Sequence, residues 1–253
     1  MNALFRRPDV IPISLGYSCH VKVFCDMMSE MDGGIGTARY PFDWAGTPMW
    51  SVNEIVECDF ADLLDRSAIK PRPRYMKDTT KFLTHDRYNV VYLHDFGKDI
   101  TNIREEMWKK AEDGYARRVE RWNGALGSGH SVLFIRLEQD KKDRIEYPEF
   151  VRERGSDELY QVQRFAETMK SRGVNCMILF LSTTHPTGFD AERKVCTVQF
   201  AKKDPSTIVG GDHIDKIVQA NLAHIRNCMA VLPFPLVPRQ QKQQQQQQQI
   251  VTI

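Results

Sequence analysis

The residues best suited to chemistry in this chain lie at a short turn near its N-terminus. Residues 13–20 read Ile-Ser-Leu-Gly-Tyr-Ser-Cys-His, which is typical of a buried strand, a glycine turn and a helix start. Ser18 is a candidate N-cap, so Cys19 would fall in the first helical turn. Unpaired backbone N–H groups and the helix dipole favour an anion there, so a thiolate would be stabilised. The alternative is that Cys19 is a buried structural thiol.

A cysteine nucleophile needs a base, and the base needs a third group that fixes its tautomer. Two further clusters offer such groups: Tyr-Pro-Phe-Asp-Trp at residues 40–44 and His-Asp-Phe at residues 94–96. We predict that His94 is the base and that Asp43 or Asp95 is the orienting carboxylate. The three clusters together predict a thiol hydrolase.

Each of these residues also has a structural interpretation. His94 could end a strand and bond to a backbone group, while Phe42 and Trp44 could pack in the core. We set His20 aside as a partner for Cys19 because adjacent residues of a helix point about 100° apart.

The same strand, turn and helix start also predict an anion site, because ligands of parallel sheets bind at the carboxyl ends of the strands. A nucleotide or nucleotide-sugar would lie there, with Arg136 reaching a phosphate from the end of its strand. With Trp44 from the second cluster, Gly16, Ser18 and Arg136 make up the predicted substrate-binding set. No glycine-rich phosphate motif is present. A glycosyltransferase-like enzyme and an inactive binding module therefore stay open beside the hydrolase.

The composition indicates a globular chain with a small-molecule or peptide substrate. Its 253 residues are 42% hydrophobic, and 35 basic side chains balance 33 acidic ones. A formal charge of +2 does not indicate nucleic acid or an anionic membrane as the main partner. No apolar run reaches the length of about 18 residues that a membrane-spanning helix needs. No apolar segment follows Arg6 and Arg7, so we expect no secretory signal and a cytoplasmic location.

The cysteines and histidines predict neither a metal site nor a cofactor. Six cysteines are scattered without a C-x-x-C motif, so we expect neither a zinc site nor a disulfide framework. His224 falls in a predicted helix, and no histidine has a ligand spacing that indicates a metal.

Strand-like and helix-like segments alternate along the chain, and the apolar runs are continuous. This predicts one α/β domain, residues 10–232, with a mostly parallel sheet flanked by helices on both faces. Residues 1–9 would form an N-terminal arm, and the Pro/Gln-rich residues 233–253 a disordered tail. The predicted strands are residues 10–15, 88–96, 131–137, 176–181 and 195–200; the predicted helices begin at residue 19 and span 49–64, 103–126, 158–172 and 214–229; residues 67–81 and 138–157 are predicted loops.

The order of these motifs resembles a known family. Ile-Ser-Leu-Gly at residues 13–16 with Cys19, then residues 40–44, 94–96 and 132–136, are similar to a domain of unknown function catalogued as a "putative papain-like cysteine peptidase". The resemblance covers about residues 11–200. It implies Cys19 as the nucleophile, His94 as the general base, and Asp43 or Asp95 as the orienting carboxylate, acting on an amide or thioester bond.

Overall fold

We analysed a computed structural model of the chain. The structure describes residues 10–17, 19–31, 38–73, 81–92, 94–96, 100, 103–138, 157–201 and 211–230. The predicted N-terminal arm, the predicted tail, Ser18 and most of the predicted loop at 138–157 lie outside these residues.

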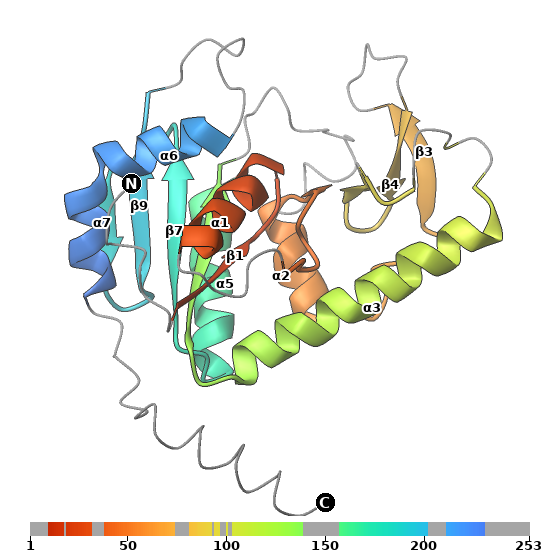
Figure 1. Cartoon of the computed structure of the whole chain (residues 1–253), viewed down its shortest axis with the longest axis horizontal. Coiled ribbons are helices and arrows are strands. Elements are labelled where there is room, and N and C mark those ends of the chain that lie inside the picture. The colour runs from red at the N-terminus through yellow and green to blue at the C-terminus, as the bar shows by residue number, and fades with distance from the viewer. Residues whose placement is uncertain are drawn as a thin grey trace, which may run out of the picture.

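A five-stranded, mostly parallel sheet forms the centre of the fold, in the order β1-β6-β7-β9-β8 (Figure 1). Four of its strands are parallel: β1 (Val10–Ser14), β6 (Ser131–Leu137), β7 (Cys176–Ser182) and β9 (Val195–Gln199). The short strand β8 (Gly188–Asp190) pairs with β9 in the antiparallel direction at the edge. Continuous apolar runs suit strands that are covered on both faces, so the predicted fold class is confirmed.

Helices pack on both faces of this sheet, and alternate strand residues point to each. On one face, Met177 and Leu179 join a core with α1 (Cys19–Met31), α6 (Gly211–Ala220) and α7 (Leu222–Met229). On the other face, Ile178 and Phe180 join a core with α2 (Met49–Glu57), α3 (Glu105–Gly127) and α5 (Glu158–Ser171). No helix in the described residues is long and apolar enough to cross a membrane.

A second, antiparallel sheet was not predicted. Its order is β2-β5-β4-β3, formed by β2 (Ala45–Gly46), β5 (Val91–Tyr92), β4 (Lys81–His85) and β3 (Ile69–Pro73). The prediction of a loop over 67–81 was therefore wrong for β3. Its prolines, Pro71 and Pro73, lack the N–H that a central strand needs, but β3 lies at the sheet edge, where proline is tolerated. The strand predicted over 88–96 shortens to the two residues of β5.

One predicted helix ends early and another is split in two. Helix α2 stops at Glu57 instead of continuing to residue 64, because Asp59 and Phe60 take positive φ angles of 48° and 63°. The helix predicted over 214–229 is split at Asn221 into α6 and α7. By contrast, α5 begins where predicted, with the Asp157 side chain accepting hydrogen bonds from two backbone N–H groups of its first turn.

Trp122 of α3 is the centre of the aromatic core between this helix and the sheet. Its indole is fully buried and contacts the rings of Phe42, Phe60, Phe134 and Phe165 at centroid distances of 5.4–6.5 Å. Phe42 belongs to the 40–44 cluster, so this predicted cluster packs directly against the aromatic core.

We predict that Trp122→Ala lowers the free energy of unfolding by about 3–5 kcal/mol, because it leaves a large cavity among four rings. Urea denaturation at constant pH measures the change. Tyr160→Ala, at a side chain that is 60% exposed, is the control and should change stability by less than about 0.5 kcal/mol. Equal effects of the two substitutions would contradict the assignment of Trp122 to the core.

Candidate functional site

Cys19 follows a strained turn at the carboxyl end of β1. Gly16 and Tyr17 have φ angles of +80° and +73°, and the backbone N–H of Gly16 donates to the Ser14 hydroxyl at 3.1 Å. Positive φ is costly for a residue with a side chain such as Tyr17, and strain of this kind gathers at functional sites. Cys19 is the first residue of the 13-residue helix α1 and is partly exposed. The predicted position of the thiol in the first helical turn is therefore confirmed.

A second turn packs tightly against the first. A side-chain carbon at Gly16 would lie only 3.2 Å from the carbonyl oxygen of Phe42 and 3.3 Å from Cβ of Thr47. Within this second turn Trp44 also has a positive φ, 64°. The ring of His94 packs edge-on against the Trp44 indole, with 5.3 Å between the ring centroids. A chain of contacts thus leads from the Cys19 turn through Trp44 to His94.

The structure does not join Cys19 and His94 by a hydrogen bond. Within the described ranges, the two side chains share none, and His94 is exposed with Trp44 as its ring neighbour. Among the described residues, neither Asp43 nor Asp95 forms a hydrogen bond with His94. The side chain of Asp43 contacts α1, and that of Asp95 contacts α3. Contacts thus connect the turn before Cys19 with Trp44 and His94, but the described residues do not form a hydrogen-bonded Cys-His-Asp triad.

Asp43 is buried and faces the helix that carries Cys19. One of its oxygens, Oδ2, accepts a hydrogen bond from the backbone N–H of Tyr40 at 2.8 Å and lies 3.6 Å from Nζ of Lys22 on α1. The other oxygen, Oδ1, has no hydrogen-bond partner. Burial raises the pKa of Asp43 to about 7, against the opposing effects of Lys22 and the Tyr40 N–H.

Asp95 is anchored to α3. Its carboxylate accepts hydrogen bonds from Nη2 of Arg118 at 2.7 Å and from the Tyr115 hydroxyl at 3.1 Å. The Arg118 and Asp95 side chains are both less than a tenth exposed, so the ion pair is buried. These contacts fix the backbone of residues 94–96 beside the site.

Arg136 of β6 connects the segments around the site through buried hydrogen bonds. Its side chain is fully buried, and Nη1 donates to the carbonyl oxygens of Leu15 at 2.9 Å and Thr47 at 2.8 Å. Its Nε donates to Glu158 in the first turn of α5 at 2.7 Å. Sequence analysis placed Arg136 at a substrate phosphate; the structure gives its guanidinium internal partners.

A further group at the same edge was missed by sequence analysis. Glu138 follows β6 and accepts hydrogen bonds from the hydroxyls of Ser182 and Thr184 and from the backbone N–H of Thr183, at 2.6–2.8 Å. Burial raises its pKa, but the hydrogen bonds from residues 182–184 outweigh burial and lower it. His185 Nε2 lies 3.8 Å from this carboxylate. The polar run at 182–185 directly after an apolar strand was the available signal.

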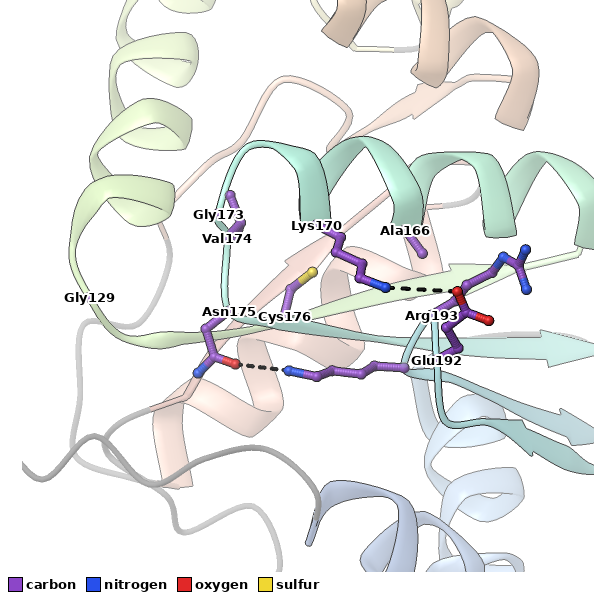
Figure 2. Close-up of a pocket in the computed structure, with 10 residues that line it drawn as sticks. Gly129, Ala166, Lys170, Gly173, Val174, Asn175, Cys176, Glu192 and Arg193 are labelled. Atoms are coloured by element: carbon purple, nitrogen blue, oxygen red, sulfur yellow. Dashed lines mark hydrogen bonds and ion pairs between the residues drawn. The ribbon is translucent and has the colours of Figure 1, made fainter.

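A pocket of about 470 Å³ lies at the opposite edge of the sheet (Figure 2). Cys176 begins β7 there, and Lys194, which directly precedes β9, donates to Asn175 at 3.4 Å. Ligands of parallel sheets bind at the carboxyl ends of strands, and this pocket lies at their amino ends. We therefore place the candidate site at the Cys19 edge.

A family model matches residues 11–185, which is more than half of the chain and includes all three predicted clusters. The chain belongs to the family described as "Putative papain-like cysteine peptidase (DUF1796)". It is also similar to the uncharacterized protein R408 of Acanthamoeba polyphaga mimivirus, at 22% identity over 144 residues, which are 51% of this chain and 62% of that protein. The match thus spans less than two thirds of the relative. No solved structure matches.

The buried carboxyl group of Asp43 predicts a pH dependence of stability for this family member. The unfolded chain loses the Asp43 proton near 3.8, whereas the folded chain keeps it to about 7. The folded state therefore binds more protons over this interval, so the contribution of Asp43 to stability falls as pH rises and is fully lost above about pH 7. The loss relative to Asp43→Asn should be about 4 kcal/mol. Parallel urea titrations of the two proteins measure it, and parallel stability curves across this range would contradict the assignment.

The contacts of Arg136 predict a large effect of removing its charge. Arg136→Met removes the cation that contacts the buried Glu158 carboxylate and the donor to two carbonyl oxygens, so the free energy of unfolding should fall by about 3–5 kcal/mol. Adding Glu158→Gln should restore part of the loss, because the carboxylate charge that Arg136 balances is then gone as well. Denaturation of the two single variants and the double variant measures the coupling. Strictly additive losses would contradict a direct interaction between the two side chains.

Proposed function

We propose that this protein is a cysteine hydrolase in which Cys19 attacks the carbonyl carbon of an amide or thioester and His94 acts as the general base and general acid. The observation that carries the proposal is the position of Cys19: it is the first residue of α1, two residues after the strained Gly16–Tyr17 turn at the carboxyl edge of the sheet. The contact of His94 with Trp44, in the turn that packs against Gly16, supports the pairing. Membership of the peptidase family supports the reaction class.

In the proposed reaction His94 takes the proton of the Cys19 thiol, and the sulfur forms a bond to the carbonyl carbon. The bond from this carbon to the leaving nitrogen or sulfur then breaks, and His94 returns the proton to the leaving group. Water next attacks the thioester that Cys19 has formed, which releases the acid and the free thiol. The dipole of α1 favours negative charge at its first turn throughout the reaction.

The two carboxylates have positioning roles in this proposal. Asp95 ties the segment that carries His94 to Arg118 and Tyr115 of α3. Asp43 lies against Lys22, one helical turn after Cys19, and so fixes the angle at which α1 leaves the turn. His94 is exposed, so in this proposal its side chain can reorient and pair with the thiol in the free protein as well as in the substrate complex.

The transferase alternative receives less support from the geometry. It needs Arg136 to contact a phosphate, but this guanidinium is fully buried and donates to Leu15, Thr47 and Glu158. We therefore argue for the hydrolase.

The pH dependence of iodoacetamide labelling tests the proposal. At about pH 6 we expect Cys19 to react about 10-fold faster than Cys58, an exposed cysteine that serves as the internal reference, because a thiolate paired with imidazole reacts and a neutral thiol does not. His94→Ala should reduce the Cys19 rate to that of Cys58. Mass spectrometry of tryptic peptides resolves the two rates in one sample.

His20→Ala is the matched control, since it removes the imidazole adjacent in sequence, and the fast Cys19 reaction should persist in it. On any amide or thioester substrate that the protein turns over, Cys19→Ala should abolish turnover. Equal reactivity of Cys19 and Cys58 in the wild type, or full turnover by Cys19→Ala, would contradict the proposed hydrolase. A Tm increase with nucleotide-sugars, without enhanced reactivity of Cys19, would instead favour the transferase. The absence of both effects would favour an inactive binding module.

A further inference from the structure

Two cysteines and a histidine converge on one point at the face of the sheet away from α3. Cys196 lies on β9, and His224 and Cys228 lie on α7. Their potential ligand atoms are all within 4.8 Å of one another. Sγ of Cys228 lies 3.7 Å from Nε2 of His224. Figure 1 shows α7 beside β9 at the edge of the molecule.

The surroundings of this cluster are apolar. Cys196 and Cys228 are almost completely buried and belong to the core formed with α6 and α1, while His224 is partly buried. An imidazole set among apolar side chains needs a polar partner, and among the described residues the ring contacts the Gly188 carbonyl oxygen at 3.3 Å and the Cys228 sulfur. Two thiols beside such a ring make a soft donor set.

We propose that Cys196, Cys228 and His224 bind a zinc ion that fastens α7 to the sheet. Tetrahedral zinc has Zn–S and Zn–N bonds of about 2.3 and 2.0 Å, which place sulfur and nitrogen about 3.6 Å apart. The separation between Cys228 and His224 is 3.7 Å. Thiolate and imidazole donors suit zinc better than magnesium or calcium, which take oxygen ligands.

The fourth position of the site faces the edge strand β8. The Gly188 carbonyl oxygen lies 3.3 Å from Nε2 of His224, about the nitrogen-to-oxygen separation across a tetrahedral zinc ion. This carbonyl or a water molecule would complete the coordination. The proposed role is structural: His224 and Cys228 are one helical turn apart, so one ion would hold a full turn of α7 on β9.

The site does not rest on the proposed hydrolase. Cys19 belongs to the turn at the start of α1, whereas the three ligands belong to β9 and α7. Sequence analysis found no zinc site because Cys196 is far from the other two ligands along the chain. The spacing of His224 and Cys228, four residues apart in a predicted helix, was the available signal, and sequence analysis did not use it.

Zinc content and thermal stability of the reduced full-length chain test the proposal. After removal of loose metal by gel filtration, the wild type should retain about one zinc ion per chain, and zinc should raise its Tm by about 5 °C or more at a free concentration of about 100 Kd. His224→Gln, at a partly buried position that tolerates an amide, should weaken zinc binding at least about 10-fold and lose the Tm shift. Cobalt in place of zinc should give a thiolate-to-metal absorption band in the wild type only.

Two cysteine variants are the controls. Cys58→Ser removes an exposed thiol and Cys176→Ala removes a buried thiol outside the cluster, and both should bind zinc as the wild type does. The proposal is overturned if His224→Gln and Cys228→Ser retain wild-type zinc content, or if the reduced wild type neither retains zinc nor gains stability from it. A Cys196–Cys228 disulfide that persists under reducing conditions, with no zinc bound, would overturn it as well.

Discussion

The buried guanidinium of Arg136 is the interaction on which the candidate site depends. It donates hydrogen bonds to the carbonyl oxygen of Leu15, just after β1, to that of Thr47, just before α2, and to the carboxylate of Glu158 at the start of α5. A buried charge is tolerated only when it is paired and its donors are used, so these elements must arrive together for the core to close. The turn that carries Cys19 and the turn that carries Trp44 are thereby fixed against each other before any ligand binds.

This constraint explains how strained backbone persists at the site. Gly16, Tyr17 and Trp44 all have positive φ, and only glycine adopts it without cost. Gly16 also lies so close to the Phe42 carbonyl that a side chain would have to displace backbone. Strain of this kind survives when the surrounding packing over-determines it. The aromatic contacts of Trp122 with Phe42 supply that packing on one side, and the Arg136 hydrogen bonds supply it on the other.

The sequence predicts the central sheet better than the second sheet, for physical reasons. Strands β6 and β7 are seven residues each and consist mostly of consecutive apolar residues, so their composition and length identify them. Strands β2 and β5 have two residues each, which is too short for any pattern, and β3 carries prolines that indicate a loop. The position of Cys19 at a helix start follows from local signals, whereas the contact of His94 with Trp44 arises only from tertiary packing.

The family name points to papain-like chemistry, yet Cys19 lies at a strand, turn and helix junction of a mostly parallel sheet. The two statements are compatible because thiol hydrolysis depends on a small constellation: a nucleophile at a helix start, an imidazole within reach, and donors for the developing oxyanion. A parallel sheet provides the first where the carboxyl end of β1 leads into α1, and the first turn of a helix is in general a source of backbone N–H donors for the third. The imidazole must then come from another element. In the proposed hydrolase this imidazole is that of His94, which comes two residues after β5. Its ring contacts Trp44, the residue before β2, and β2 pairs with β5.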